Sequence, residues 1–422
     1  MFNFKRKMQL VTLLLVLAGP FPAAADLGGF LDLRGGLRVQ EPVAERDVSL
    51  LEGRLQLEAD HATDLAALQL RVDLVGDAVN SGEALDPEAG KGILDLREAY
   101  ALFAPHELID LKIGRQILTW GTGDLLFVND LFPKDWQAFF IGRDVEYLKA
   151  PSDAVLLSFF PEWGTLDIAY TPSFDADRYI SGERLSYFNP QAGRVVGRDR
   201  QLAVAQPNRW FQDDELALRF SRNLAGVELA VYGYVGYWKS PAGFDSASGR
   251  AIFPHLSVYG ASARGILAEG VANLELAWYD SRDDSAGSDP LVPNSEQRLL
   301  VGYERELASE LTGSVQYYLE HMLDYSAYQH SLPAGMAVKD ENRQVLTLRL
   351  TKLLMNQTLT LSLFGYWSPT DQDSYLRPNL AYKVSDDWLV TAGANLFAGP
   401  REAFFGQFTD NSNLYVGARY SF

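Results

Sequence analysis

The 422-residue sequence lacks cysteine and is poor in basic residues. Without cysteine it can hold no disulfide, zinc–thiolate or iron–sulfur site, no thiol nucleophile and no lipidated cysteine. Its 37 Lys and Arg residues stand against 55 Asp and Glu residues, and the formal net charge of −18 argues against general nucleic-acid binding. The 47% hydrophobic and 12% aromatic content is too high for a disordered chain.

The first 25 residues have the pattern of a cleaved secretory signal. Lys5, Arg6 and Lys7 precede a short apolar stretch over 10–18, and three alanines at 23–25 form a cleavage site. Cleavage removes three of the 37 cations and none of the 55 acids, so the mature net charge is −21. No later stretch has about 18 consecutive apolar residues, so no transmembrane helix is expected. The exported chain is therefore either soluble or a β-barrel.

From residue 26 onward, apolar and polar residues alternate with the period of two that β-strands require. About eighteen such segments follow one another, one of them over 143–160, and tight turns alternate with long loops such as 76–92. This segregation is typical of outer-membrane barrels, with turns in the periplasm and loops outside. We predict a single all-β domain over 26–422, a transmembrane antiparallel β-barrel of about 18 strands.

The C-terminal segment supports the same class. Apolar residues alternate with polar or small ones from Leu414 to Phe422, and the chain stops on that phenylalanine. This resembles the terminal strand of bacterial outer-membrane proteins, whose final Phe is recognised by the assembly machinery. The resemblance implies insertion in the outer membrane, in contact with its lipid.

Three short segments carry a more specific resemblance. They are Leu96-Arg97-Glu98-Ala99-Tyr100, Ile113-Gly114-Arg115-Gln116 and Trp120-Gly121-Thr122-Gly123. Together they are similar to a strand-to-loop region of alginate-export-type and related porin families. That resemblance implies a barrel of about 18 strands that carries anionic or small polar solutes.

The polar side of each predicted strand forms the lining of the pore. The residues that we expect there are Arg34, Arg38, Arg54, Arg71, Arg97, Lys112, Arg349, Arg377, Lys383, Arg419, Glu52 and Glu58. Six of the cations come from the last strands and the first, which adjoin in a closed barrel and would form one basic wall. Such walls favour anions in pores. The alternative is ion pairing across the lumen, which only stiffens the wall.

Two charged residues break the alternation. Glu98 and Arg115 share the faces of apolar neighbours, where a charge facing lipid costs about 2–4 kcal/mol for Arg at mid-depth. We predict that the two form a structural ion pair turned inward by a β-bulge near Gly114. A pair that snorkels at the membrane interface is the alternative.

The loop over 118–142 is unusually rich in apolar and aromatic residues, so it should not lie in water. We predict that it folds into the barrel as a constriction loop containing Trp120, Asp124, Asp130, Lys134 and Trp136. Asp124, Asp130, Lys134 and Asp135 would then face the passage. Packing over the rim or against a neighbouring subunit is the alternative. The polar segment 174–212 is predicted to be a long extracellular loop.

The sequence carries no signal for covalent chemistry. The five histidines fit no metal motif, and no serine-centred elbow is present. We therefore expect no enzyme activity, no catalytic residue, no metal and no cofactor. The predicted function is an outer-membrane channel for passive diffusion of small polar solutes, with anions among them. A dedicated transporter of an anionic saccharide and a non-conducting barrel that scaffolds a periplasmic or electron-transfer partner are the alternatives.

Overall fold

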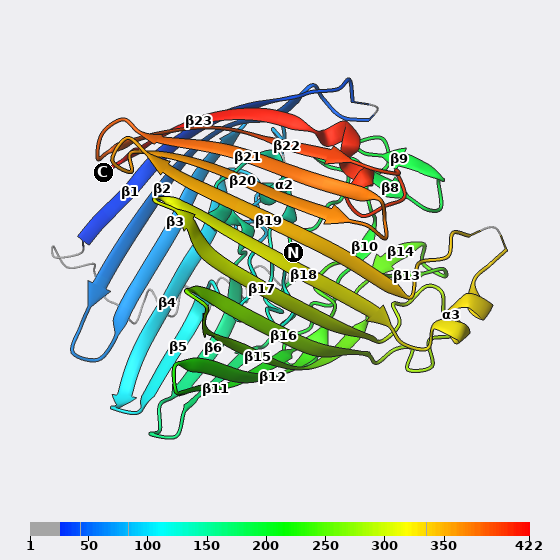
Figure 1. Ribbon diagram of the computed structural model, residues 1–422, viewed down its shortest axis with the longest axis horizontal. Helices are drawn as coiled ribbons and strands as arrows, with labels where there is room; N and C mark the ends of the chain where they lie inside the picture. The colour runs from blue at the N-terminus through cyan, green and yellow to red at the C-terminus, as the bar shows by residue number, and fades with distance from the viewer. Residues whose placement is uncertain (1–25, 43, 83, 335) are drawn as a thin grey trace.

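The computed structural model describes residues 26–422 apart from positions 43, 83 and 335, so the predicted signal over 1–25 lies outside the described residues. One sheet of eighteen strands forms the wall, and every strand pairs antiparallel with its neighbours. The last strand pairs with the first, from Phe30 opposite Ser421 to Arg38 opposite Asn413, and this closes the barrel. Figure 1 shows the strands running obliquely around the lumen. The predicted fold class is confirmed.

The eighteen wall strands are β1 (Asp26–Arg38), β2 (Val48–Ala62), β3 (Ala67–Asp77), β4 (Leu94–His106), β5 (Ile109–Gln116), β6 (Ser152–Phe159), β7 (Thr165–Thr171), β11 (Glu215–Leu224), β12 (Val227–Tyr237), β15 (His255–Leu267), β16 (Gly270–Ser281), β17 (Glu296–Ala308), β18 (Leu311–Met322), β19 (Asn342–Leu354), β20 (Leu359–Ser368), β21 (Asp373–Lys383), β22 (Trp388–Ala398) and β23 (Asn413–Ser421).

Tight turns lie at one end of the barrel and long connections at the other, and we call these the turn end and the loop end. The turns include 107–108, 225–226 and 268–269. One connection at the loop end, 369–372, is also short. The predicted strand over 143–160 is wrong in its first half, because the wall strand there begins only at Ser152.

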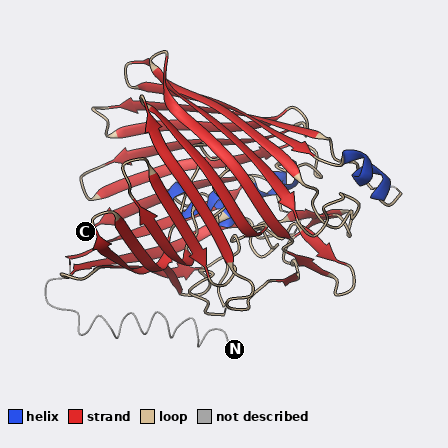
Figure 2. Cartoon of the chain, turned by 90° about the horizontal axis from the view of Figure 1, so that it is seen from below, coloured by secondary structure: helices blue, strands red, loops and turns tan. Residues whose placement is uncertain are grey.

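The connections contain small elements of their own. They are α2 (Trp136–Ile141), the 3₁₀ turn η1 (Val145–Leu148), β8 (Tyr187–Asn189), β9 (Arg194–Val196), β10 (Val204–Ala205), β13 (Gly243–Asp245), β14 (Arg250–Ile252), α3 (Tyr325–Ser331) and the 3₁₀ turn η2 (Gly406–Asn411). Figure 2 shows helical segments inside the barrel and α3 projecting beyond its loop end. Within the described part of the chain, no helix has the length and hydropathy to cross a bilayer.

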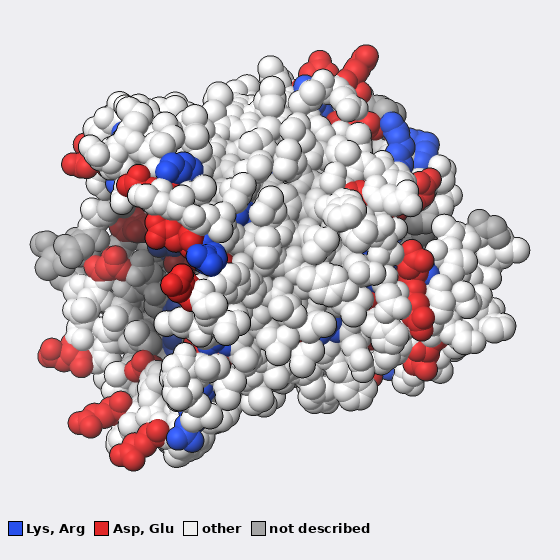
Figure 3. Space-filling view, viewed as in Figure 1, with Lys and Arg blue, Asp and Glu red and all other residues white. Residues whose placement is uncertain are grey.

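The period of two separates the two faces of the wall. On β2, Leu51 is 52% exposed on the outside, whereas Glu52 and Arg54 are buried on the inside. Leu218 of β11 and Val301 of β17 are likewise exposed outward. Figure 3 shows that charged side chains gather at the two ends of the molecule and leave the band between them almost free of charge. An apolar band of this kind is what a lipid-facing barrel surface requires.

Candidate pore and its constriction loop

The connection between β5 and β6, residues 117–151, runs inside the barrel rather than over its rim. We call it the constriction loop. Its helix α2 begins where the Asp135 carboxylate accepts a hydrogen bond from the Ala138 N–H at 2.7 Å, a side-chain cap of the first turn. It ends at Gly142, whose φ of 94° is the left-handed conformation that glycine tolerates.

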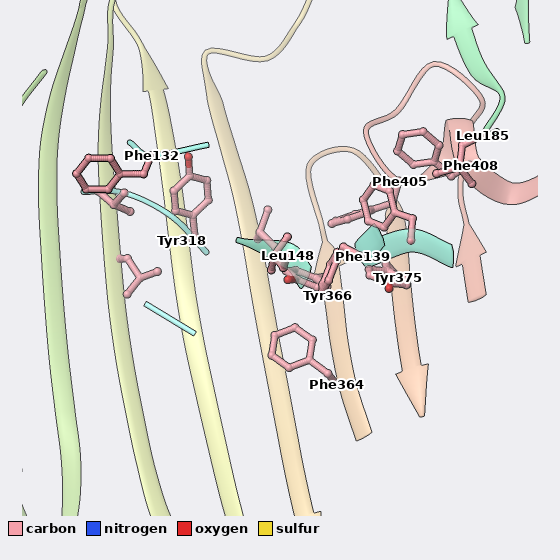
Figure 4. Close-up of a cluster of buried hydrophobic side chains, with 14 of the residues drawn as sticks. Phe132, Phe139, Leu148, Leu185, Tyr318, Phe364, Tyr366, Tyr375, Phe405 and Phe408 are labelled. Carbon is pink, nitrogen blue, oxygen red and sulfur yellow. The ribbon is translucent and has the colours of Figure 1, made fainter. Parts of the chain in front are cut away.

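Aromatic packing holds α2 against the inner wall. Phe140 contacts Tyr375 of β21 edge-on with ring centroids 5.5 Å apart, and Phe397 of β22 at 5.3 Å. Figure 4 shows Phe139 beside Tyr366 and Tyr375 in the same cluster. Each buried aromatic ring removes a large apolar area from water. A six-residue helix is too short to be stable alone, so this packing stabilises it.

Polar contacts attach the constriction loop to one side of the wall. Asp124 accepts two hydrogen bonds from the Arg349 guanidinium of β19, at 2.5 and 2.7 Å. The Gln316 amide of β18 bonds both the N–H and the carbonyl of Asp124 at 2.8 Å. The hydroxyl of Tyr366 donates to the Leu125 carbonyl at 2.8 Å.

The far end of the loop is bonded to the opposite side. The Tyr147 hydroxyl donates to the Asp73 carboxylate of β3 at 2.9 Å, and Arg143 pairs with Glu52 of β2 at 2.5 Å. Arg34 of β1 donates to the Gly142 carbonyl at 2.9 Å. The constriction loop therefore spans the lumen between strands that lie far apart in the wall.

The structure corrects part of what was expected of the loop residues. Asp130 and Lys134 do not face a passage: both are buried, and they pair with each other at 3.0 Å. Asp124 is engaged by Arg349 as described. Trp120 packs edge-on against Phe132 at 4.9 Å, and the Trp136 indole N–H donates to Asp177 at 3.0 Å. The expectation overlooked that desolvating this apolar loop buries its charges, which must then be paired.

Five of the expected wall cations have carboxylate partners. Arg34 pairs with Asp32, Arg54 with Asp73, Arg71 with Glu58, Arg349 with Asp124, and Arg419 with Asp32 and Glu146. Both expected acids, Glu52 and Glu58, are partners in such pairs. Several acidic partners come from the constriction loop. Three of the six cations of the basic wall, Arg34, Arg349 and Arg419, are thus paired with carboxylates of the adjacent wall or of the constriction loop.

The other five wall cations have no carboxylate within 4.0 Å among residues 26–422 as described; they are Arg38, Arg97, Lys112, Arg377 and Lys383. Arg38 donates to the Arg184 carbonyl at 2.6 Å, and Arg97 to the Lys149 carbonyl at 2.7 Å. Lys112 lies 3.7 Å from the Tyr100 ring centroid, Arg377 lies 4.7 Å from that of Phe139, and Lys383 is exposed at the turn end. These groups carry the uncompensated positive charge of the wall.

The predicted ion pair between Glu98 and Arg115 is wrong. Glu98 pairs with Arg71 at 3.2 Å, and Arg115 pairs with Asp153 at 3.3 Å. A β-bulge is present, but on β4: Val72 faces Leu96 and Arg71 faces Glu98, so Arg97 is the extra residue. The bulge turns Glu98 inward beside Arg71. Gly114, which has a φ of 127°, lies opposite Tyr100.

A cavity of about 560 Å³ lies where the constriction loop meets the loops over 78–93 and 172–214. It is lined by seven carboxylates and by five cations, Lys91, Arg115, Arg143, Arg178 and Arg184. Burial alone lowers the pKa of the Arg178 guanidinium, but Asp95 and Asp135 more than offset this and raise it. Burial raises the pKa of the Asp177 carboxyl, although Lys134 N–H, Trp136 and Ser240 donate to it.

Sequence reasoning missed Arg143, Tyr147 and Arg178 as lumen residues. The first two were assigned to a strand, although Gly142 before them and Pro151 after them are local signs of an irregular segment. Arg178 reaches Asp95 across 83 positions of sequence, and no local pattern announces such a contact.

The fold of this chain, a closed eighteen-stranded barrel, is similar to that of solved structures from other bacteria. Among solved structures, OccAB1 of Acinetobacter baumannii matches with a TM-score of 0.56 and 10% identity, over 96% of this chain and 98% of that chain. OccK11 (OpdR) of Pseudomonas aeruginosa matches with a TM-score of 0.53 and 10% identity, over 94% and 95%. A mutant of the Rhodopseudomonas blastica porin matches with a TM-score of 0.41 and 11% identity, over 94% and 100%.

At these identities the likeness concerns the fold. No protein-family model matches the sequence, and no curated protein sequence matches it.

Proposed function

We propose that the protein is an outer-membrane channel for passive diffusion of small polar solutes. The observation that carries this proposal is the division of each strand: the outward face is apolar across the middle of the barrel, and the inward face is polar and charged. Lipid on one side and water on the other account for both faces. The turn end then faces the periplasm, and the exposed Phe422 lies there within reach of the assembly machinery.

We further propose that the passage prefers anions. Five wall cations lack a carboxylate within 4.0 Å among the described residues. The expected wall acids Glu52 and Glu58 are ion-paired, and Glu275 and Glu304 are inner-face acids with no cation within that distance in the described chain. Fixed positive charge raises the local concentration of anions in a pore. The cavity at the loop end carries both signs, with seven carboxylates and five cations, so we expect the preference to be modest.

The test is single-channel recording in planar bilayers, with reversal potentials measured under a salt gradient. A steady conductance with a reversal potential on the anion side is the expected result. Cation selectivity contradicts the charge proposal and leaves the channel proposal standing.

A non-conducting barrel that scaffolds a partner is the second candidate. The bonding of the constriction loop to both sides of the wall, through Asp124 on one side and Tyr147 on the other, favours it. Complete absence of conductance in correctly folded protein would select this candidate and reject the channel.

A further inference from the structure

The Glu275 side chain of β16 is wholly buried and is surrounded by the start of the constriction loop. One carboxylate oxygen accepts from the Thr122 N–H, from the Thr122 hydroxyl at 3.0 Å and from the Gly123 N–H at 2.7 Å. The other accepts from the N–H of Asn129 at 3.0 Å and from its side-chain amide at 2.8 Å. All five donors belong to the loop, and none belongs to the wall.

No Lys or Arg of the described chain lies within 4.0 Å of this carboxylate, so the donors of the loop alone stabilise its charge. Hydrogen bonds to an ionised group are roughly twice as strong as those between neutral groups. Gly121 allows the loop to close over the carboxylate, because a Cβ there would lie 3.2 Å from one oxygen and 3.3 Å from the other. Its φ of 84° also favours glycine.

The contact between Glu275 and the constriction loop lies far around the wall from the strand at which the loop begins. The loop leaves the wall at β5, and β16 lies six strands further around the eighteen-strand barrel. Glu275 and Asn273, both on β16, are the first wall residues to which the loop is bonded by several hydrogen bonds after leaving β5. The contacts of Asp124 with Gln316 and Arg349 lie on β18 and β19, beyond Glu275 around the wall.

We propose that Glu275 is the positioning residue that sets the width of the passage, by fixing the start of the constriction loop to β16. This inference rests on the proposed channel function. With the five bonds in place, the loop lies across the lumen in one arrangement. Without them, Thr122 and Val128 are bonded to β16 only by Asn273 and Tyr279, so the start of the loop shifts and the passage widens intermittently.

The substitution Glu275→Gln tests the proposal with little change of shape. The glutamine NH₂ group replaces one of the two carboxylate oxygens and cannot accept a hydrogen bond. It must face either the three donors of Thr122 and Gly123 or the two donors of Asn129, so at least two of the five bonds are lost. We expect a single-channel conductance about 1.5-fold higher or more, with frequent steps between levels, since a narrow pore conducts according to its constriction.

The matched control is Glu304→Gln on the neighbouring strand β17. Glu304 faces Val271 in the register, lies on the inner face and is exposed, and none of its hydrogen bonds or ion pairs is to the loop. The substitution Glu304→Gln removes one negative charge, as Glu275→Gln does, and breaks no contact with the constriction loop. We expect wild-type conductance from it, with only a small change in ion selectivity.

The outcomes separate the two proposals. Absence of conductance in folded wild-type protein rejects the channel function itself. A conducting wild type with an unchanged Glu275→Gln variant overturns the role of Glu275 and leaves the channel intact. If Glu275→Gln does not fold, the double variant Thr122→Val, Asn129→Ala removes two of the five donors from the loop side. It must then raise the conductance, and an unchanged conductance overturns the proposal equally.

Discussion

At the residue scale, charges inside this barrel are stabilised in three different ways. Arg54 pairs with the Asp73 carboxylate at 2.5 Å. Arg97 donates to the Lys149 carbonyl, and the Lys112 ammonium lies 3.7 Å from the centroid of the Tyr100 ring. Only the first kind cancels the charge, because carbonyls and rings stabilise a cation and leave its field in the lumen. The net positive charge of the interior is therefore smaller than the number of its arginines suggests, but it is not zero.

Removal of the Arg115 side chain should weaken the folded barrel. This buried guanidinium pairs with Asp153 and donates to the carbonyls of Leu96 and Glu88, so Arg115→Ala removes all three interactions. Hydrogen bonds to a charged group are worth about 1.5–3 kcal/mol each, so we expect a clear loss of stability. The measurement is the temperature at which the folded band disappears in heat-modifiability gels. Arg194→Ala, which breaks an exposed pair with Asp199, is the control and should leave that temperature unchanged.

Neutralising a single lumen cation should change ion selectivity. Lys112 faces the lumen with no carboxylate within 4.0 Å among the described residues, so Lys112→Gln lowers the local positive potential. A unit charge about 10 Å from a permeating ion in water contributes about 0.4 kcal/mol, which is about twofold for each ion. Anions and cations change in opposite senses, so the anion-to-cation permeability ratio changes by up to about fourfold at low salt. Lys352→Gln is the control, since Lys352 lies on the outer face and donates to the Ser309 carbonyl. An anion-to-cation permeability ratio that is equal in the two variants contradicts the assignment of Lys112 to the lumen.

At the element scale, the constriction loop is ordered by what it contacts. Its only α-helix is α2, which has six residues, and backbone groups of Gly123, Asp124 and Leu125 are bonded to side chains from the wall. Asp177, from the loop over 172–214, joins it to a further connection, because this carboxylate accepts from Lys134 N–H, Trp136 and Ser240. Three connections at the loop end thus meet on one carboxylate.

Asp177→Ala should loosen all three connections. It leaves three donors without an acceptor in a buried place, at a cost of about 1–3 kcal/mol for each donor that water does not reach. We expect faster tryptic cleavage within 172–214 and 238–254 of the folded protein, followed by mass spectrometry of the fragments. Asp199→Ala lies in the same loop but breaks an exposed pair, and its cleavage rate should match that of the wild type. Equal rates for both variants would show that Asp177 does not join the loops.

The strands were predictable from the sequence, and most contacts of the constriction loop were not. Alternation is local, so a window around Leu51 and Arg54 already indicates which side chains share a face. The bond between Thr122 and Glu275 joins residues 153 positions apart, and that between Arg349 and Asp124 joins residues 225 apart. Nothing in a local window specifies such partners. The bulge at Arg97 illustrates the limit, since one extra residue reversed the expected faces beyond it.

At the scale of the whole molecule, the barrel wall has an apolar outer face and a polar inner face, and the overall composition is the average of the two. The outer face exposes residues such as Leu218 and Val301, whereas Glu275 and Asp73 are wholly buried inside. Charge gathers at the two ends of the barrel (Figure 3). Stability in a bilayer therefore depends on which face a substitution alters more than on the residue type introduced.

A cation placed on the outer face at mid-depth should destabilise the barrel, whereas the same cation on an exposed inner position should not. Val231 lies near the middle of β12 and is 54% exposed outward, and Ile266 lies near the turn end of β15 with an inward parity and 84% exposure. Val231→Arg should lower the free energy of unfolding by about 2–4 kcal/mol, measured by urea titration in phospholipid vesicles, because the guanidinium must leave water for hydrocarbon. Ile266→Arg should shift it by less than about 1 kcal/mol. Equal effects of the two substitutions would contradict the assignment of the outer face to lipid, since an arginine in water costs the same on either side of the wall.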